Sequence, residues 1–316
     1  MLPRPLLAAW LCFFLGCAHA AYPDRPVKII VPFSAGAAAD AVMRPLAAAL
    51  AAKWQQQVLV ENRPGLTVGP QSAAAAPADG YTLLFGAAST MVTTPLTTAK
   101  LPYDVKRDFV PVVRLAILPT VLAVNPALGA RSLKDLMALV RARPAALNYA
   151  SSGRGAPNHL AMEYLLSLTG GEMVNVPYKG AAPAVVDMVG NQVQVGFMAV
   201  PSVLPHLRSG RLLALAVGSK KRSPLLPDVP TVSETVPGFE YFAWYGLFAP
   251  KGTPAAVIDK VYADVVQVLG TPELQRVLMA EGSEPSPTTG TELAREIEKE
   301  TLLWKGIIQQ RKLQLD

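Results

Sequence analysis

Short apolar runs alternate along the chain with longer stretches in which small and apolar residues recur at helical spacing. The run from Val27 to Val31 is mostly β-branched and predicts a strand that can be covered on both faces. The alanine- and leucine-rich stretch that follows, as far as Trp54, predicts a helix. Strands that alternate with helices in this way predict an α/β protein with mostly parallel sheets and helices on both faces.

The same order begins again after an apolar strand pair near residues 111–124. A strand over 147–150 is followed by Pro157, which suits the first position of a helix because its φ angle is already fixed. On that helix three residues recur every four positions and mark the expected buried face: Leu160, Tyr164 and Leu168.

Two such α/β stretches, with the chain returning late to the first, predict two lobes joined by two crossovers. We expect lobe 1 to comprise residues 21–122 and 247–316, and lobe 2 residues 123–246, after a leader at 1–20. The stretch from Trp244 to Pro250 has the extended pattern expected of the returning crossover. The cleft between the lobes is the default place for a ligand.

Each predicted lobe contains a strand that runs through a short loop straight into a helix. The loop of lobe 1 carries Gly36. The run 151–160, which follows the predicted strand of lobe 2, is richer in glycine and hydroxyl groups. Such a loop aims free backbone N–H groups and the positive helix end at one point, where a small carboxylate fits. An ordinary βα turn has the same local pattern, so these loops alone leave both interpretations open.

The composition indicates a compact globular protein. Of the 316 residues, 51% are hydrophobic and only 16% are charged, which argues against disorder. The net charge of +6 comes from scattered basic residues, without the basic stripe and interleaved aromatics of a nucleic-acid binder. We therefore expect no nucleic-acid partner.

The N-terminus has the layout of a secretory signal peptide. Arg4 precedes the apolar run 6–15 and the small-residue site that ends at Ala20, and the run is too short to span a bilayer. Both cysteines, Cys12 and Cys17, lie in this leader, so the mature chain carries no thiol, as suits an oxidising compartment. We expect a periplasmic location; lipid attachment at Cys17 is the alternative.

Eight short segments, in register over essentially the whole mature chain, resemble one family: the Bug proteins, TctC-type solute receptors of tripartite tricarboxylate transporters. These segments are Tyr22-Pro23, Val31-Pro32-Phe33 with Gly36 and Asp40, Glu61-Asn62-Arg63-Pro64-Gly65, Asp79-Gly80-Tyr81-Thr82, Ser152-Gly153-Arg154-Gly155 with His159-Leu160, Pro177-Tyr178-Lys179-Gly180, Leu215-Ala216-Val217 and Pro227-Asp228-Val229-Pro230-Thr231.

The resemblance implies a type II periplasmic binding protein fold, with two α/β lobes closing on a small carboxylated ligand held mainly by backbone amides, hydroxyls and bridging waters. In lobe 1 the implied ligand-binding residues are Phe33, Ser34, Ala35, Gly36, Ala37 and Asp40, with Ser89 and Thr90 nearby. In lobe 2 they are Ser152, Gly153, Arg154, Gly155, Ala156, His159 and Tyr178.

The chain departs from the family pattern in the first loop. Family members commonly have two glycines where this chain has Gly36-Ala37, and often a proline where it has Ser34-Ala35. These changes bear on which ligand is bound. Pro45, inside the first predicted helix, removes a hydrogen bond to the carbonyl of Ala41 and should bend that helix.

Several side chains have two possible roles. Asp40 could accept from a ligand amine or stabilise its own helix start. Arg154 could add a bidentate contact to a carboxylate or point to solvent. Ser89 and Thr90 could line the pocket, cap a helix, or do both. His159 is expected to orient the glycine-rich loop.

The sequence thus predicts an extracytoplasmic solute-binding protein, monomeric and without enzymatic activity, cofactor or metal, that serves a tripartite tricarboxylate-type transporter. Dicarboxylates, acidic amino acids, aromatic acids and citrate-like compounds all remain open as ligands. A ligand-sensing adaptor for a membrane sensor kinase fits the same residues. A secreted hydrolase with Ser151 or Ser152 as nucleophile is the alternative from another class, and it would need a base and an orienting acid that no local motif supplies.

Overall fold

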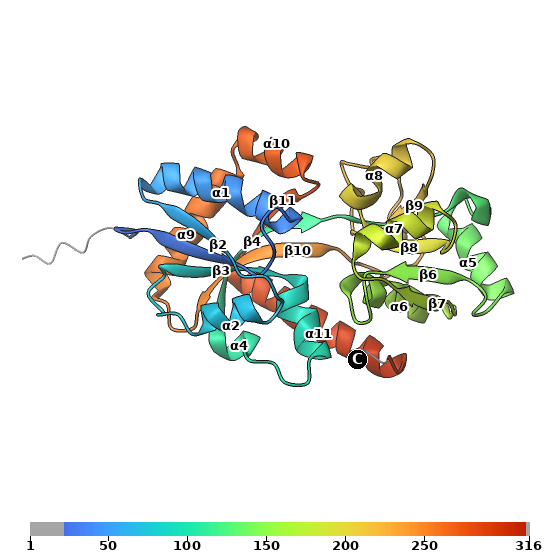
Figure 1. Ribbon diagram of the computed structural model, residues 1–316, viewed down its shortest axis with the longest axis horizontal. Coiled ribbons are helices and arrows are strands. Elements are labelled where there is room, and N and C mark those ends of the chain that lie inside the picture. The colour runs from blue at the N-terminus through green and yellow to red at the C-terminus, as the bar shows by residue number, and fades with distance from the viewer. Residues whose placement is uncertain (1–21, 314–316) are drawn as a thin grey trace, which may run out of the picture.

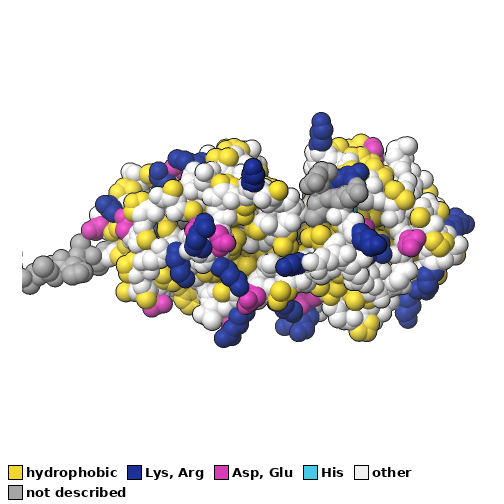
Figure 2. Space-filling model, turned by 90° about the horizontal axis from the view of Figure 1, so that it is seen from below, with side chains coloured by type: hydrophobic (Ala, Val, Ile, Leu, Met, Phe, Trp, Pro, Cys, Tyr) yellow, Lys and Arg dark blue, Asp and Glu magenta, His cyan; other side chains and the backbone are white. Residues whose placement is uncertain are grey.

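The computed structural model describes residues 22–313 and shows two α/β lobes side by side, each built on its own sheet (Figure 1). The predicted leader with both its cysteines lies outside the described residues. Seen from below, the molecule narrows between the lobes, and Lys and Arg side chains are scattered over this face rather than gathered into a stripe (Figure 2).

Lobe 1 is a six-stranded sheet with helices on both faces. Its strands, in sheet order, are β11 (Glu284–Thr289), β4 (Phe109–Leu118), β10 (Ala243–Pro250), β3 (Thr82–Ala87), β1 (Val27–Val31) and β2 (Val58–Asn62). Its helices are α1 (Ala38–Trp54), α2 (Val68–Ala74), α3 (Thr94–Thr97), α4 (Val105–Asp108), α9 (Ala255–Leu269) and α10 (Pro272–Ala280), with a π-helical turn, η1, at Ser89–Thr93.

Lobe 2 is a five-stranded sheet. Its strands, in sheet order, are β7 (Val174–Pro177), β6 (Asn148–Ser151), β8 (Val195–Ala199), β5 (Thr120–Val124) and β9 (Leu213–Val217). Its helices are α5 (Leu133–Ala142), α6 (Pro157–Thr169), α7 (Ala181–Val189) and α8 (Val200–Arg208), with short 3₁₀ turns η2 (Pro126–Leu128) and η3 (Val232–Glu234).

Both sheets are mixed, which corrects the expectation of mostly parallel sheets. In each lobe the strand that enters from the other lobe, β5 or β10, runs antiparallel to its neighbours. It must do so because it begins beside the crossover, where β3 and β8 end. The stretch predicted as an extended crossover is thus β10, a central strand of lobe 1. The boundaries expected at 122/123 and 246/247 fall inside β5 and β10.

The first predicted strand and helix form the buried centre of lobe 1. Val42, Leu46 and Leu50 of α1 recur every four residues and are at most 1% exposed, packed with the apolar residues of β1. The helix continues through Pro45 without interruption. In α6, Leu160 and Tyr164 are buried as predicted, whereas Leu168, in the last turn, is 44% exposed.

The last helix, α11 (Gly290–Gln310), belongs to both lobes, although the sequence placed it in lobe 1. It begins against β4 and ends beneath lobe 2, where Trp304 packs edge-on against Tyr164 and Tyr241 and Arg311 bonds Glu163 at 2.7 Å (Figure 1). It thus ties the lobes together without being a covalent crossover. Among residues 22–313 no helix is long and apolar enough to cross a membrane.

Two glycines of α11 test this arrangement. A Cβ at Gly290 would lie 2.1 Å from the carbonyl oxygen of Pro111 in β4, whereas one at Gly306 would meet nothing within 4 Å. We expect Gly290→Ala to lower the free energy of unfolding by about 1–3 kcal/mol, because backbone must move. Gly306→Ala, the matched control, should raise it by roughly 0.5–1 kcal/mol through helix propensity. Urea unfolding measures both, and equal stability of the two variants would contradict the packing of α11 on β4.

Candidate functional site

Strand directions bring the two predicted loops to the same space between the lobes. In lobe 1 the start of β10 pairs with the end of β3, Tyr245 opposite Ala87, and β1 runs parallel to β3. In lobe 2 the start of β5 pairs with the end of β8, Thr120 opposite Ala199, and β6 runs parallel to β8. The loops that follow β1 and β6 therefore both lie at the lobe ends nearest the crossovers (Figure 1).

A buried carboxylate organises the loop between β1 and α1. Asp40, 3% exposed, accepts hydrogen bonds from the N–H of Gly36 (2.9 Å), Nε of Arg44 (2.7 Å) and Nδ2 of Asn62 (2.9 Å). Burial disfavours its charge, but these hydrogen bonds outweigh burial and hold the pKa of Asp40 below its usual value. Of the two roles open to Asp40, these contacts support the one at its own helix start.

Two loop amides that were expected to face a ligand are used within the loop. The N–H of Gly36 donates to Asp40, and the N–H of Ala37 donates to the carbonyl of Ser34 at 3.1 Å. These two N–H groups are therefore engaged within the protein in this structure, and ligand binding by Gly36 and Ala37 stays a prediction. Over residues 22–313 no protein acceptor is found for four neighbouring N–H groups, those of Ser34, Ala35, Ala38 and Ala39. The last two belong to the first turn of α1, which the sequence reasoning missed.

His159 organises the loop between β6 and α6, the orienting role expected of it. It is 4% exposed, its Nδ1 accepts from the N–H of Gly155 at 3.0 Å, and its ring stacks on Tyr149. An Nδ1 that accepts carries no proton, so the imidazole is neutral. Burial lowers the pKa of His159 and favours that neutral form, with a smaller opposing effect of Glu163.

Two amides of the second loop are likewise engaged within the loop. Gly155 gives its N–H to His159, and Ala156 gives its N–H to the carbonyl of Gly153 at 3.2 Å. Asn158, absent from the predicted site, accepts from the N–H of Ser152 at 3.1 Å and so fixes the loop. Within the described chain four N–H groups here lack a protein acceptor: those of Gly153, Arg154, Asn158 and His159.

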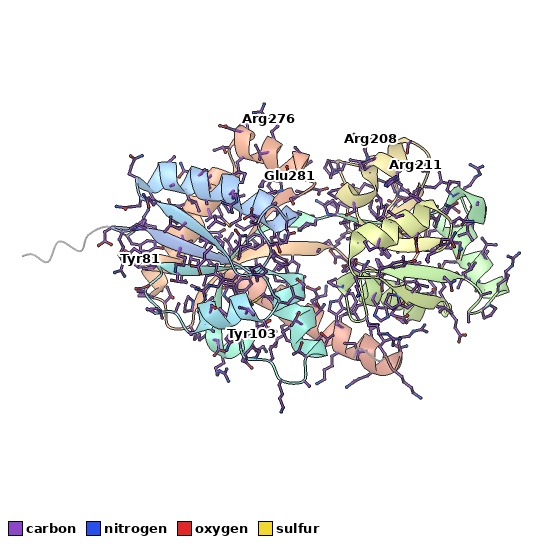
Figure 3. All side chains as sticks on the ribbon, in the orientation of Figure 1. Tyr81, Tyr103, Arg208, Arg211, Arg276 and Glu281 are labelled. Atoms are coloured by element: carbon purple, nitrogen blue, oxygen red, sulfur yellow. The ribbon has the colours of Figure 1, made fainter. Side chains whose placement is uncertain are left out.

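The remaining predicted residues divide between loop support and surface. Thr90 is fully buried, and its hydroxyl closes the turn after β3 by bonding both backbone groups of Ala87. Tyr103 (Figure 3) donates to the Thr90 carbonyl and holds that turn. Ser89 is half-buried, and Phe33 is half-buried against Phe85, edge to face. Thr90 therefore supports the turn after β3 rather than capping a helix, whereas Ser89 can still line the space.

Two predicted site residues of lobe 2, Tyr178 and Arg154, form no hydrogen bond with the amides of the loop after β6. Tyr178 donates to Asp187 at 2.7 Å, and burial together with Asp187 raises the pKa of Tyr178 to about 12. Arg154 is exposed and lines a hollow of about 330 Å³ with His159, Glu163 and Lys312. Of the two roles open to Arg154, this placement favours the one facing solvent.

Within residues 22–313, neither serine that was considered as a nucleophile has the surroundings of one. Ser151 is fully buried and donates to the carbonyl of Gly153, and Ser152 accepts from Asn158 at 3.3 Å. Among residues 22–313 neither hydroxyl forms a hydrogen bond with a histidine. Within the same range no group of three or more His, Cys, Asp or Glu side chains could hold a metal ion. What the two loops offer is a set of unpaired N–H donors, which suits an anion.

Comparison with known proteins identifies the family. Residues 42–313 match the model of the TctC family, the tripartite tricarboxylate transporter family receptor. The chain belongs to this family. Its members are periplasmic solute-binding receptors rather than enzymes.

Three known proteins are similar to this chain over nearly their whole length. BugT of Bordetella pertussis is 36% identical over 92% of this chain and 90% of its own. The R. palustris protein Rpa4515, solved with adipate, is 33% identical with a TM-score of 0.78, covering 92% of this chain and 99% of that one. MatC from Rhodopseudomonas palustris, solved with bound malate, is 30% identical with a TM-score of 0.73, covering 91% and 100%.

The loop function of Asp40 can be tested in this receptor by changing it to Asn. At pH 7 we expect Asp40→Asn to lower the free energy of unfolding by about 1–2 kcal/mol, because charge-assisted hydrogen bonds are lost and the Arg44 partner is half exposed. The folded-state pKa of Asp40 is lowered, so its contribution is complete above the unfolded value near about 4 and is lost as pH falls through the folded value.

Unfolding curves from pH 7 to pH 2 measure this difference. The control is Asp259→Asn, an exposed aspartate of α9 without a hydrogen bond among the described residues, which should leave stability unchanged. A wild-type-minus-Asn difference that stays constant down to pH 2 would show that the carboxylate charge does not hold the loop.

Proposed function

We propose that this TctC-family receptor captures a small carboxylate between the loops after β1 and β6. The observation that carries the proposal is the set of N–H groups without protein acceptors at both loops, each of which lies at the end of its lobe beside the crossovers. The adipate and malate found with Rpa4515 and MatC support the same class of ligand for this chain.

The physical reason is desolvation. A carboxylate that leaves water loses strong hydration, and charge-assisted hydrogen bonds, each worth roughly 1.5–3 kcal/mol net, must replace it. Each loop alone supplies half of the donors. The ligand therefore binds better when the lobes hold both loops against it, and binding shifts the population toward the closed form.

Neutral amide donors also explain why no paired arginine is required. The N-terminal ends of α1 and α6 each add the positive end of a helix dipole to their free N–H groups. The donors are fixed to strands and helices, so little ordering cost is added on binding. Binding of this kind is reversible and leaves the ligand chemically unchanged.

The cellular role follows from the family and from the predicted leader. We propose that residues 1–20 direct export, that the mature receptor acts as a monomer in the periplasm, and that it delivers its carboxylate to a tripartite tricarboxylate-type transporter. Passing the ligand to a membrane sensor kinase is the alternative use of the same binding event, and deletion of the transporter genes separates the two by their effect on uptake.

A proline substitution tests the donor role of α1. Ala38 is the first helical residue, where proline is well tolerated, so Ala38→Pro removes one free N–H with little effect on folding. A thermal-shift screen of carboxylates that includes adipate and malate first selects the ligand, and calorimetry then measures its affinity. We expect Ala38→Pro to weaken binding about tenfold or more, the equivalent of one charge-assisted hydrogen bond.

The matched control is Ala255→Pro, the first residue of α9 and also exposed, which should leave affinity unchanged. Both variants should unfold within about 0.5 kcal/mol of the wild type. Equal affinity of Ala38→Pro and wild type would remove the first turn of α1 from the binding site. A screen in which neutral solutes raise the melting temperature and carboxylates do not would contradict the proposed function itself.

A further inference from the structure

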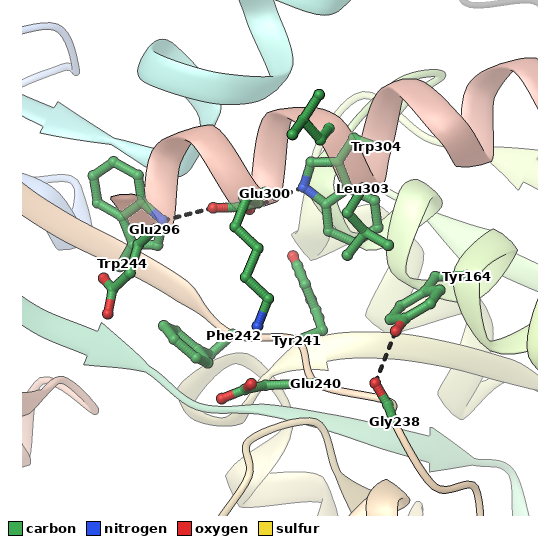
Figure 4. A pocket seen from close by; sticks show the side chains of 12 residues that line it. Tyr164, Gly238, Glu240, Tyr241, Phe242, Trp244, Glu296, Glu300, Leu303 and Trp304 are labelled. Carbon is green, nitrogen blue, oxygen red and sulfur yellow. Dashed lines mark hydrogen bonds between the residues drawn. The ribbon is translucent and has the colours of Figure 1, made fainter. Parts of the chain in front are cut away.

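A second cavity, of about 540 Å³, lies where the returning crossover meets α11. It is enclosed by α11, the start of β10, the segment 238–242 and α6, and five aromatic residues form much of its wall: Tyr164, Tyr241, Phe242, Trp244 and Trp304 (Figure 4). The loops after β1 and β6 contribute no residue to it. Its volume falls in the range that holds a drug-sized molecule.

The charged groups of this hinge cavity are mostly acidic. Glu296 is already neutralised, because both its oxygens accept from Nη1 of Arg114 at 2.8 Å. Glu300 accepts only from neutral donors, the indole N–H groups of Trp244 and Trp304, each at 2.9 Å. Burial raises the pKa of Glu300, and the two indole hydrogen bonds oppose that rise. The Glu300 carboxylate therefore has no positively charged partner among the described residues.

Glu240 is the third carboxylate of the hinge cavity. Among residues 22–313 it forms neither a hydrogen bond nor an ion pair, although it is only partly exposed. Lys299 also lines the cavity, but it is exposed and, within the described residues, pairs with none of these carboxylates. Two carboxylates in or beside an aromatic wall are thus left without a positive partner.

Tyr241 provides an independent indication of a ligand. Its side chain belongs to a residue that is 4% exposed, and burial raises the pKa of its hydroxyl, yet that hydroxyl has no hydrogen-bond partner in the described chain. Figure 4 shows the hydroxyl directed across the cavity toward α11. The hydroxyl oxygen is not fully enclosed by protein, so it offers the cavity an unused donor and acceptor.

We propose that the hinge cavity binds an organic ammonium ion with an apolar, preferably aromatic, body. The ammonium group would meet Glu240 and the faces of the neighbouring aromatic rings, the arrangement in which proteins hold organic cations. The apolar body would lie against the aromatic rings of the wall, because the Glu300 carboxylate already occupies the position between the indole N–H groups of Trp244 and Trp304. The free Tyr241 hydroxyl would accept from the ammonium group. The Arg114 guanidinium, 5.7 Å over the Phe242 ring, shows that this wall already attracts a cation.

Charge separates this site from the carboxylate site between the lobes. An anionic ligand would face Glu240 and Glu300, whereas an ammonium ion would find no comparable carboxylate free in the loops after β1 and β6, where Asp40 is fully engaged. The two ligands therefore do not compete for one place. Failure of one proposal leaves the other standing.

Calorimetry with phenethylamine tests the proposal on the mature chain, residues 21–316. Phenethyl alcohol, which has the same body without the charge, and 3-phenylpropionate, which carries the opposite charge, are the matched probes. We expect phenethylamine to bind about tenfold more tightly than phenethyl alcohol, the equivalent of one desolvated cation–π contact with its carboxylate. Equal binding of the amine and the alcohol would overturn the proposal.

Single substitutions test whether Glu240 and Tyr241 contact the ammonium group. Glu240→Gln and Tyr241→Phe, which conserve side-chain size, should each weaken phenethylamine binding about fivefold or more. Glu281→Gln changes an exposed glutamate that directly follows α10 and lies away from the cavity (Figure 3), and it should leave binding unchanged. If Glu240→Gln and Glu281→Gln weaken binding equally, only the net charge of the protein matters and the proposal fails.

The indole N–H signals of the tryptophans report where phenethylamine binds. The mature chain contains three tryptophans, Trp54 and the cavity residues Trp244 and Trp304. In ¹⁵N–¹H spectra phenethylamine should shift the indole signals of the two cavity tryptophans and leave that of Trp54, which is bonded to Asp264 in lobe 1, in place. A shift of Trp54 alone, or of none of the three, would contradict binding in the hinge cavity.

Discussion

The hydration lost by a carboxylate is the constraint on which the site depends. A protein that replaces this hydration with neutral donors needs many N–H groups at one place, and one helix start supplies only a few. Two lobes whose strands end at a common space supply two sets. The buried supports, Asp40 in lobe 1 and His159 in lobe 2, use the inner amide of each loop and leave the outer ones unpaired. Each loop is thus held rigid by its own polar residue while its remaining donors stay available.

In the described part of the chain, three connections join the two lobes at the hinge. The chain crosses between the lobes twice, and α11 adds a non-covalent connection that begins on β4 and ends against α6. Glu300 lies at the middle of this connection, bonded to an indole from β10 and an indole from its own helix. The aromatic residues around it form the packing between the lobes, and the hinge cavity lies within that packing. The same elements therefore set the lobe arrangement and enclose the second cavity.

Much of the fold could be predicted because the local signals agree with one another. The buried strand from Val27, the helix that ends at Trp54 and the start of α6 at Pro157 all follow from short-range chemistry, and the structure confirms them. The antiparallel course of β10 could not be predicted, because it depends on where the chain re-enters lobe 1. Strand β11 was missed because Pro285 and Pro287 argue against a strand, yet an edge position tolerates them.

The sequence predicted the candidate site as two loops and not as individual donors. The structure brings both glycine-containing loops to the lobe ends beside the crossovers. Whether an amide in them is free depends on side chains such as Asp40 and Asn158, whose hydrogen bonds cannot be deduced from residue spacing. The most direct measurement is a ¹⁵N–¹H titration of the mature chain with the carboxylate that binds best. If one carboxylate bridges the two loops, the amide signals of Ala38 and Ala39 and those of Asn158 and His159 should move with a single shared midpoint. Movement confined to one loop, or two separate midpoints, would contradict it.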